Sequence, residues 1–121
     1  MGFILTVIAL DLCYGNILMK RKILFSIVTP LGFTVRTTES YWTLIQSKHP
    51  EITGMLGLIK DILKMPDFVT QSKIDKDVFL FYRKINNYWL CSITKCLGIE
   101  GFLITTYITD KIKEGKKVWP S

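Results

Sequence analysis

The chain has 121 residues, of which 49% are hydrophobic and 21% are charged. This length and composition are typical of one globular domain with a buried core, and they exclude a disordered tail, a repeat array and an enzyme with separate substrate and cofactor lobes. The formal net charge of +6 favours an anionic partner such as nucleic acid or lipid headgroups, although solubility alone also accounts for it.

The N-terminal run is apolar. Residues 2–19 contain Asp11 as their only charge, and a basic cluster at residues 20–22 follows them. A secretory signal has the opposite order. The run is close to the lower limit of about 17 residues for a membrane span, and Asp11 near its middle would cost about 2.5–3.5 kcal/mol. We therefore expect residues 1–18 to be an apolar extension without a function, with a weak membrane anchor as the alternative, and residues 19–121 to be a single domain.

Cysteine and histidine are scarce. The three cysteines, Cys13, Cys91 and Cys96, are an odd number, which argues against a disulfide framework. Cys91 and Cys96 are five residues apart in a predicted strand and so point to opposite faces, which argues, with only one histidine in the sequence, against a structural zinc site. We expect no metal and no cofactor, and reduced thiols in a cytoplasmic protein.

Residues 23–38 favour a strand and a second short strand. Residues 23–28 are rich in β-forming residues, residues 29–32 contain the turn residues Pro30 and Gly32, and residues 33–36 alternate between apolar and polar. These patterns predict a strand followed by a hairpin partner.

Two helices are expected next. Thr37 or Thr38 caps the first helix, which Pro50 ends. Apolar residues recur at helical spacing over residues 51–65 and predict a second helix that ends at Pro66.

After the predicted helices, apolar residues recur at every second position, which is typical of β-strands. Tight turns separate several of the segments, and the tail from residue 110 to 121 is basic. Helices followed by an antiparallel meander predict an α+β fold, with two N-terminal helices packed on a four- to five-stranded antiparallel sheet. The predicted strands are residues 68–71, 78–85, 88–96 and 102–108.

Motifs for several classes of enzyme are absent. The sequence has no glycine-rich phosphate loop, no H-E-x-x-H, no nucleophile elbow and no C-x-x-C pair. These absences leave metal-independent acid–base chemistry or binding as the remaining functions.

A small set of polar side chains could carry such chemistry, and each has a simpler interpretation. Histidine is a common acid–base group in catalysis, but His49 also stands at a helix end, where histidine is common. Arg83 lies at the end of an aromatic strand, where its guanidinium would either bind a phosphate or simply be solvated. Thr105 and Tyr107 share one strand face. Their hydroxyl groups could bind phosphate and ribose, or the strand could simply be a half-exposed one rich in β-forming residues. Lys95 faces a cleft or solvent. Together these groups are what metal-independent RNA cleavage needs, namely an acid, a base and cations for the developing charge.

The sequence also resembles a known group of nucleases. Its motifs are similar to those of small phage- and toxin-type nucleases of the barnase/EndoU/colicin/RelE-like group, over about residues 23–120. The segments that carry the resemblance are residues 29–38, Trp42, 48–50, 65–67, 78–83, 101–109 and 112–115.

The resemblance implies a function and roles for individual residues. It implies metal-independent RNA cleavage that leaves a cyclic phosphate, in a toxin–antitoxin or phage-conflict setting. By position, His49 is the acid or base, Arg83 is the phosphate-binding cation, and Thr105 and Tyr107 line the scissile phosphate. We further expect five cations to bind nucleic acid: Arg36, Lys48, Lys95, Lys111 and Lys113.

The expected function is therefore that of a toxin-like, metal-independent endoribonuclease acting through the ribose 2′-OH. Its expected partners are RNA and a cognate antitoxin protein, with no small-molecule cofactor and no membrane. The main alternative is a non-catalytic module of the same fold that binds nucleic acid or protein, because phosphate neutralisation needs no acid–base pair. A second alternative is a domain held at a membrane by its N-terminal segment.

Overall fold

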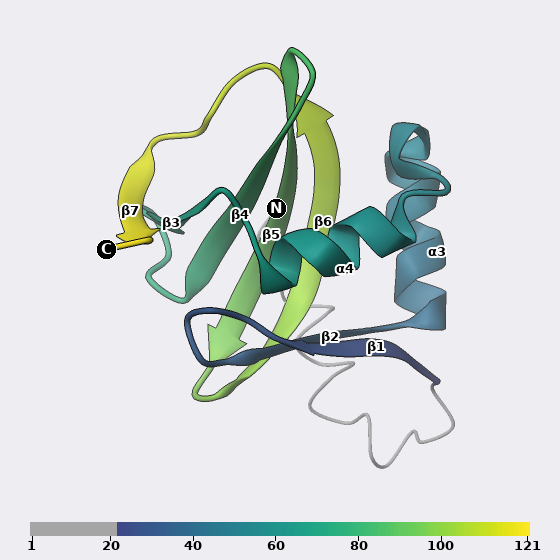
Figure 1. Cartoon of the computed structure of the whole chain (residues 1–121). Helices are drawn as coiled ribbons and strands as arrows, with labels where there is room; N and C mark the ends of the chain where they lie inside the picture. Colours follow the sequence, from purple (N-terminus) through teal and green to yellow (C-terminus); the bar gives the residue numbers. More distant parts are fainter. Residues whose placement is uncertain (1–21) are drawn as a thin grey trace.

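The computed structural model describes residues 22–121 (Figure 1). The extension or anchor expected at residues 1–18 lies outside the described residues. Within residues 22–121, no helix has the length and apolar character needed to cross a membrane.

The described chain begins with a strand hairpin, continues through two α-helices and a short 3₁₀ helix, and ends with five further strands. The elements in order are β1 (Ile23–Val28), β2 (Thr34–Thr38), α3 (Glu39–Lys48), η1 (Pro50–Ile52), α4 (Leu56–Lys64), β3 (Phe68–Ser72), β4 (Val78–Ile85), β5 (Tyr88–Leu97), β6 (Glu100–Thr109) and β7 (Gly115–Trp119).

The strands form one seven-stranded mixed sheet in the order β1-β2-β6-β5-β4-β3-β7. Residues 34–36 of β2 pair with residues 100–102 of β6 in parallel, and the other neighbouring strands pair antiparallel. The predicted architecture, two N-terminal helices on a four- to five-stranded antiparallel sheet, is therefore wrong. The hairpin β1–β2 precedes the helices and belongs to the sheet, and β7 adds a further strand at the other edge.

Both errors have physical reasons. The β2–β6 pairing joins segments about 65 residues apart in the chain, and hairpin patterns predict only local antiparallel pairs. The β7 segment contains Lys116 and Lys117, whose charge is typical of a solvated tail but also of an edge strand.

The helices begin and end largely where their capping residues predict. The Thr38 hydroxyl accepts a hydrogen bond of 3.2 Å from the Tyr41 N–H, and α3 stops before Pro50. The single helix predicted over residues 51–65 is instead two pieces, η1 and α4. Gly54 separates them with φ at +83°, a left-handed conformation that interrupts a right-handed helix.

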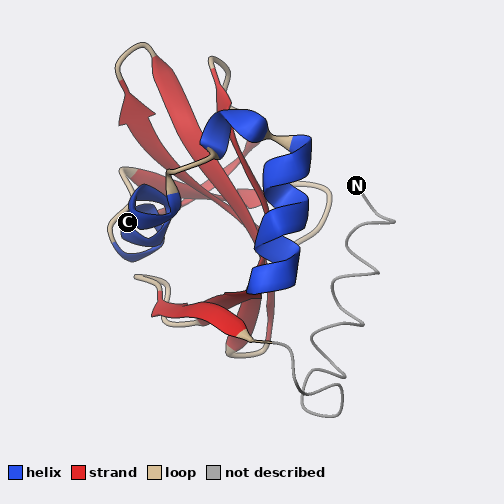
Figure 2. Ribbon diagram, turned by 90° about the vertical axis from the view of Figure 1, so that its right-hand side faces the viewer, coloured by secondary structure: helices blue, strands red, loops and turns tan. Residues whose placement is uncertain are grey.

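The central strands have two distinct faces. On the face that we call the helix face, Val69, Phe81, Ser92 and Thr106 lie in one cross-strand row and are buried. Figure 1 shows α4 crossing in front of the central strands while α3 stands beside β6, and Figure 2 shows the helices in blue from a second direction. The helix face is therefore the main core.

The opposite face, which we call the open face, carries the residues that concern function. One row consists of Phe68, Tyr82, Cys91 and Tyr107. The next row consists of Thr70, Leu80, Ile93 and Thr105. The predicted placement of Thr105 and Tyr107 on one face is confirmed, since they lie opposite Ile93 and Cys91.

Candidate functional site

The candidate site lies where the end of α3 meets β6. Beyond its short pairing with β2, β6 runs alongside α3 (Figure 1). The Tyr41 hydroxyl donates a hydrogen bond to the Ile104 carbonyl and ties the helix to the strand. This contact ties the first turn of α3 to β6, and His49 caps the other end of the same helix.

His49 is held at three points. Its backbone N–H donates to the Ile45 carbonyl at 2.8 Å and so caps the helix. Its ring stacks on the Tyr107 ring, with centroids 5.8 Å apart and planes inclined by 30°. Its Nδ1 lies 3.4 Å from Oε2 of Glu51, and the side chain is 34% exposed. With Nδ1 beside a carboxylate, Nε2 is the nitrogen left for an external partner.

The surroundings of Tyr107 make its phenol hydroxyl harder to deprotonate. Burial raises its pKa, and its hydrogen bond with Cys91 raises it further. Burial also raises the pKa of the Cys91 thiol, to about 12. At neutral pH both groups are protonated, so Tyr107 offers a ring surface and a neutral hydroxyl rather than a base.

A small cavity of about 100 Å³ adjoins these residues between α3 and β6. Lys48, His49 and Thr105 all line it. The structure thus brings together His49, Thr105 and Tyr107 of the predicted catalytic set, with the cation Lys48 beside them.

A second cation reaches the same region from the connection between β6 and β7. The Lys113 ammonium lies 5.9 Å from the centre of the Tyr107 ring, a cation–π contact. Its backbone N–H donates to the Tyr82 hydroxyl at 3.2 Å, so the connection is anchored to the open face. The Lys111 side chain is exposed on the same connection.

Arg83 is not part of this group. It lies on the helix face, opposite Leu90, and its guanidinium donates to the carbonyls of Asp61 and Met65 at the end of α4. Cations are favoured there because the C-terminal end of a helix is the negative end of its dipole. The phosphate-binding role expected for Arg83 stays a prediction.

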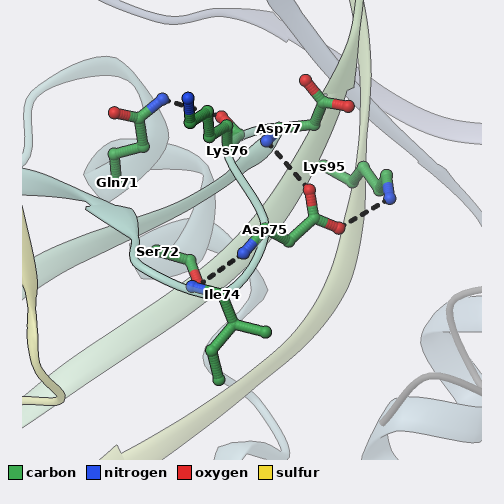
Figure 3. A network of polar contacts seen from close by, with 7 residues as sticks. All are labelled: Gln71, Ser72, Ile74, Asp75, Lys76, Asp77 and Lys95. Carbon is green, nitrogen blue, oxygen red and sulfur yellow. Dashed lines mark hydrogen bonds and ion pairs between the residues drawn. The ribbon is translucent and has the colours of Figure 1, made fainter.

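Two further cations predicted to bind nucleic acid have acidic partners. Arg36 lies 3.7 Å from Glu100, and the Lys95 ammonium lies 2.8 Å from Oδ2 of Asp75 (Figure 3). A phosphate would have to compete with these carboxylates, so they contribute less to an anion site than Lys48 and Lys113.

Glu51 is the site residue that the sequence interpretation missed. It follows the helix-breaking Pro50 in the short η1 turn, which brings its carboxylate back to the His49 ring. The local signal was the His-Pro-Glu run, in which the turn forced by proline brings residues two apart close together. Within residues 22–121, no three His, Cys, Asp or Glu side chains form a group that could hold a metal ion.

Comparisons with known proteins find no relative. No protein-family model matches the chain, and neither a curated protein nor a solved structure is significantly similar to it.

Proposed function

We propose that this protein is a small endoribonuclease that cleaves RNA without a metal, with His49 and Glu51 as its acid–base pair. One observation carries the proposal. A histidine, stacked on Tyr107 and 3.4 Å from a carboxylate, stands at a partly exposed point where Lys48 and Lys113 supply positive charge.

The pair fits the proton transfers of this reaction. The ribose 2′-oxygen attacks the adjacent phosphorus and loses its proton to a base, while the 5′-oxygen leaves and takes a proton from an acid. A carboxylate and an imidazolium perform these two roles, and the products are a 2′,3′-cyclic phosphate and a 5′-hydroxyl end.

The surrounding groups supply binding and charge. Lys48 lines the cavity with His49, and the Lys113 ammonium lies over the ring of Tyr107, on which His49 stacks, so a phosphate bound beside His49 would have these two lysines in its surroundings. Neither has a carboxylate within 4.0 Å among the described residues. Positive charge at this position stabilises the phosphorane-like transition state, which carries more charge than the substrate.

The alternative is a module that binds RNA without cleaving it. The same two lysines favour it, because phosphate binding needs no proton transfer. In that case, the contacts of His49 with Tyr107 and Glu51 serve only to hold the end of α3. An antitoxin protein as a partner stays a prediction from the family resemblance.

The test is incubation of the full chain with total RNA in EDTA, beside His49→Ala and the control Ser47→Ala. Ser47 lies in the same helix turn, but its hydroxyl donates within the helix to the Leu44 carbonyl. Cleavage by the parent and the control, but not by His49→Ala, supports the proposal. Cleavage by all three removes His49 from the mechanism. Salt-dependent binding without cleavage favours the binding module.

A further inference from the structure

The open face contains a second and larger cavity, of about 520 Å³. Its floor consists of aliphatic side chains from the three central strands: Val78, Leu80, Ile93 and Ile104. Cavities of roughly 300–1,000 Å³ with apolar walls and a few polar groups are typical of small-molecule sites. The volume and the walls therefore fit a compact apolar ligand.

One wall is a preformed loop between β3 and β4. The Ser72 hydroxyl accepts hydrogen bonds from the N–H groups of Ile74 and Asp75, and the Asp75 carboxylate accepts from the Asp77 N–H and the Lys95 ammonium (Figure 3). The Gln71 amide donates to the Lys76 carbonyl at 2.8 Å. These contacts hold the wall in place without a ligand, so less conformational entropy is lost on binding.

The mouth of the cavity has an exposed apolar residue at its rim. The Ile74 side chain is 98% exposed, although it lines the cavity. In Figure 3, it projects away from the polar contacts of Asp75 and Lys95. A molecule in the cavity would cover this side chain and remove its apolar surface from water.

The charges at the mouth leave one cation unmatched. Lys73 lies 3.2 Å from Glu114, and Asp75 lies 2.8 Å from Lys95, so these four charges neutralise one another. Lys113 also lines the cavity and has no carboxylate within 4.0 Å among the described residues. The complementary ligand therefore carries a single negative charge.

We propose that this cavity binds a small amphipathic anion, with its apolar body on Leu80, Ile93 and Ile104 and its anionic group at Lys113. The Lys73–Glu114 ion pair spans the mouth, but its side chains are 64% and 85% exposed. An ion pair so exposed contributes little stability, so it does not prevent entry. The proposal goes beyond RNA cleavage and does not depend on it, although both sites would use the Lys113 ammonium.

The test is fluorescence titration of the full chain with two probes of similar apolar body: anionic 8-anilinonaphthalene-1-sulfonate and neutral N-phenyl-1-naphthylamine. Ile74→Asp should weaken binding of both probes about tenfold, because it places a charge where apolar contact is needed. Lys113→Gln should weaken only the anionic probe, about fivefold. Both side chains are exposed, so the variants should fold.

Matched controls are Ile99→Asp and Lys64→Gln, which change an exposed isoleucine in the turn between β5 and β6 and an exposed lysine at the end of α4; neither residue lines the cavity. Saturable binding that only the cavity variants weaken supports the proposal. It is overturned by equal weakening in the controls, by binding that does not saturate, or by full affinity in Ile74→Asp. Equal affinity of parent and Lys113→Gln for the anionic probe removes the anionic requirement and with it the proposed ligand class.

Discussion

The imidazole of His49 stacks on the phenol ring of Tyr107, with centroids 5.8 Å apart. His49 comes from the end of α3 and Tyr107 from β6, so this contact joins the helix to the open face of the sheet. The stacking fixes the plane of the imidazole, while Glu51 lies beside Nδ1. The orientation of the proposed acid–base group therefore depends on an aromatic ring rather than on a hydrogen bond alone.

Replacing Tyr107 tests whether its ring or its hydroxyl matters. Tyr107→Phe keeps the stacking and should retain RNA cleavage within about threefold, because the neutral hydroxyl bonds to Cys91 and takes no part in proton transfer. Tyr107→Ala should lower cleavage by about 100-fold, since a misplaced catalytic group costs about that much. Initial rates on one RNA oligonucleotide measure both effects. A Phe variant as inactive as the Ala variant would show that the hydroxyl itself is required.

Arg83 should matter for stability more than for cleavage. Its guanidinium donates to the carbonyls of Asp61 and Met65 at the end of α4, and hydrogen bonds from charged groups contribute about 1.5–3 kcal/mol when buried. Arg83 is partly exposed, so Arg83→Ala should lower the free energy of unfolding in urea by about 1.5 kcal/mol. If Arg83→Ala keeps parental stability yet loses RNA cleavage, the residue binds phosphate after all.

The position of Arg83 shows what sequence patterns leave open. Alternation along β4 places Arg83 on the same face as Phe81 and on the opposite face from Tyr82. Strand periodicity does not say which of the two faces the helices cover. The side of the sheet on which α4 packs determines the surroundings of both residues. Arg83 therefore donates to carbonyls of α4, while Tyr82 lies on the open face with the candidate site.

A bulge determines the position of Tyr107. Residues 94–97 and 100–103 pair in the register that the turn at Gly98 sets, but from Ile93 onward the register shifts by one residue. Without this shift Tyr107 would oppose Leu90 on the helix face instead of Cys91 on the open face. The strand itself was predictable from alternation, whereas a one-residue bulge leaves no clear pattern in a run of β-forming residues.

The Asp75–Lys95 ion pair should make stability depend on pH in the acid range. The Asp75 carboxylate accepts hydrogen bonds from the Lys95 side chain and from the Asp77 N–H. These two bonds, the first having the larger effect, lower the pKa of Asp75 below the ordinary value of 3.8. A carboxyl with a lowered folded-state pKa contributes stability above its unfolded value and loses that contribution as the pH falls through the folded value.

Asp75→Asn should therefore be less stable than the parent at pH 7, by about 1 kcal/mol or less for a partly exposed pair. The difference between the two proteins should narrow below about pH 4. Urea unfolding at a series of pH values measures it, with Asp110→Asn as a control because Asp110 has no ion pair among the described residues. A difference that stays constant down to pH 2 would argue against the ion pair.

Gly101 tests the junction at which β2 joins β6. A Cβ at this position would lie 2.8 Å from Cδ2 of Phe33 and 3.0 Å from the Thr34 carbonyl oxygen. Gly101→Ala should therefore lower the free energy of unfolding by about 1–3 kcal/mol. The control is Gly57→Ala in α4, where nothing lies within 4 Å, and it should raise stability by up to about 1 kcal/mol. Parental stability in Gly101→Ala would contradict the close parallel pairing of β2 with β6.

The most direct test of RNA cleavage through the 2′-OH uses two oligonucleotides in EDTA. They are identical except that the second has deoxyribose at the one nucleotide whose 3′-phosphate the protein cleaves in the first. We predict cleavage of the all-ribose strand to a 2′,3′-cyclic phosphate, seen by mass spectrometry, and an intact bond in the substituted strand. Cleavage of both strands at the same bond, or of neither, would contradict the account.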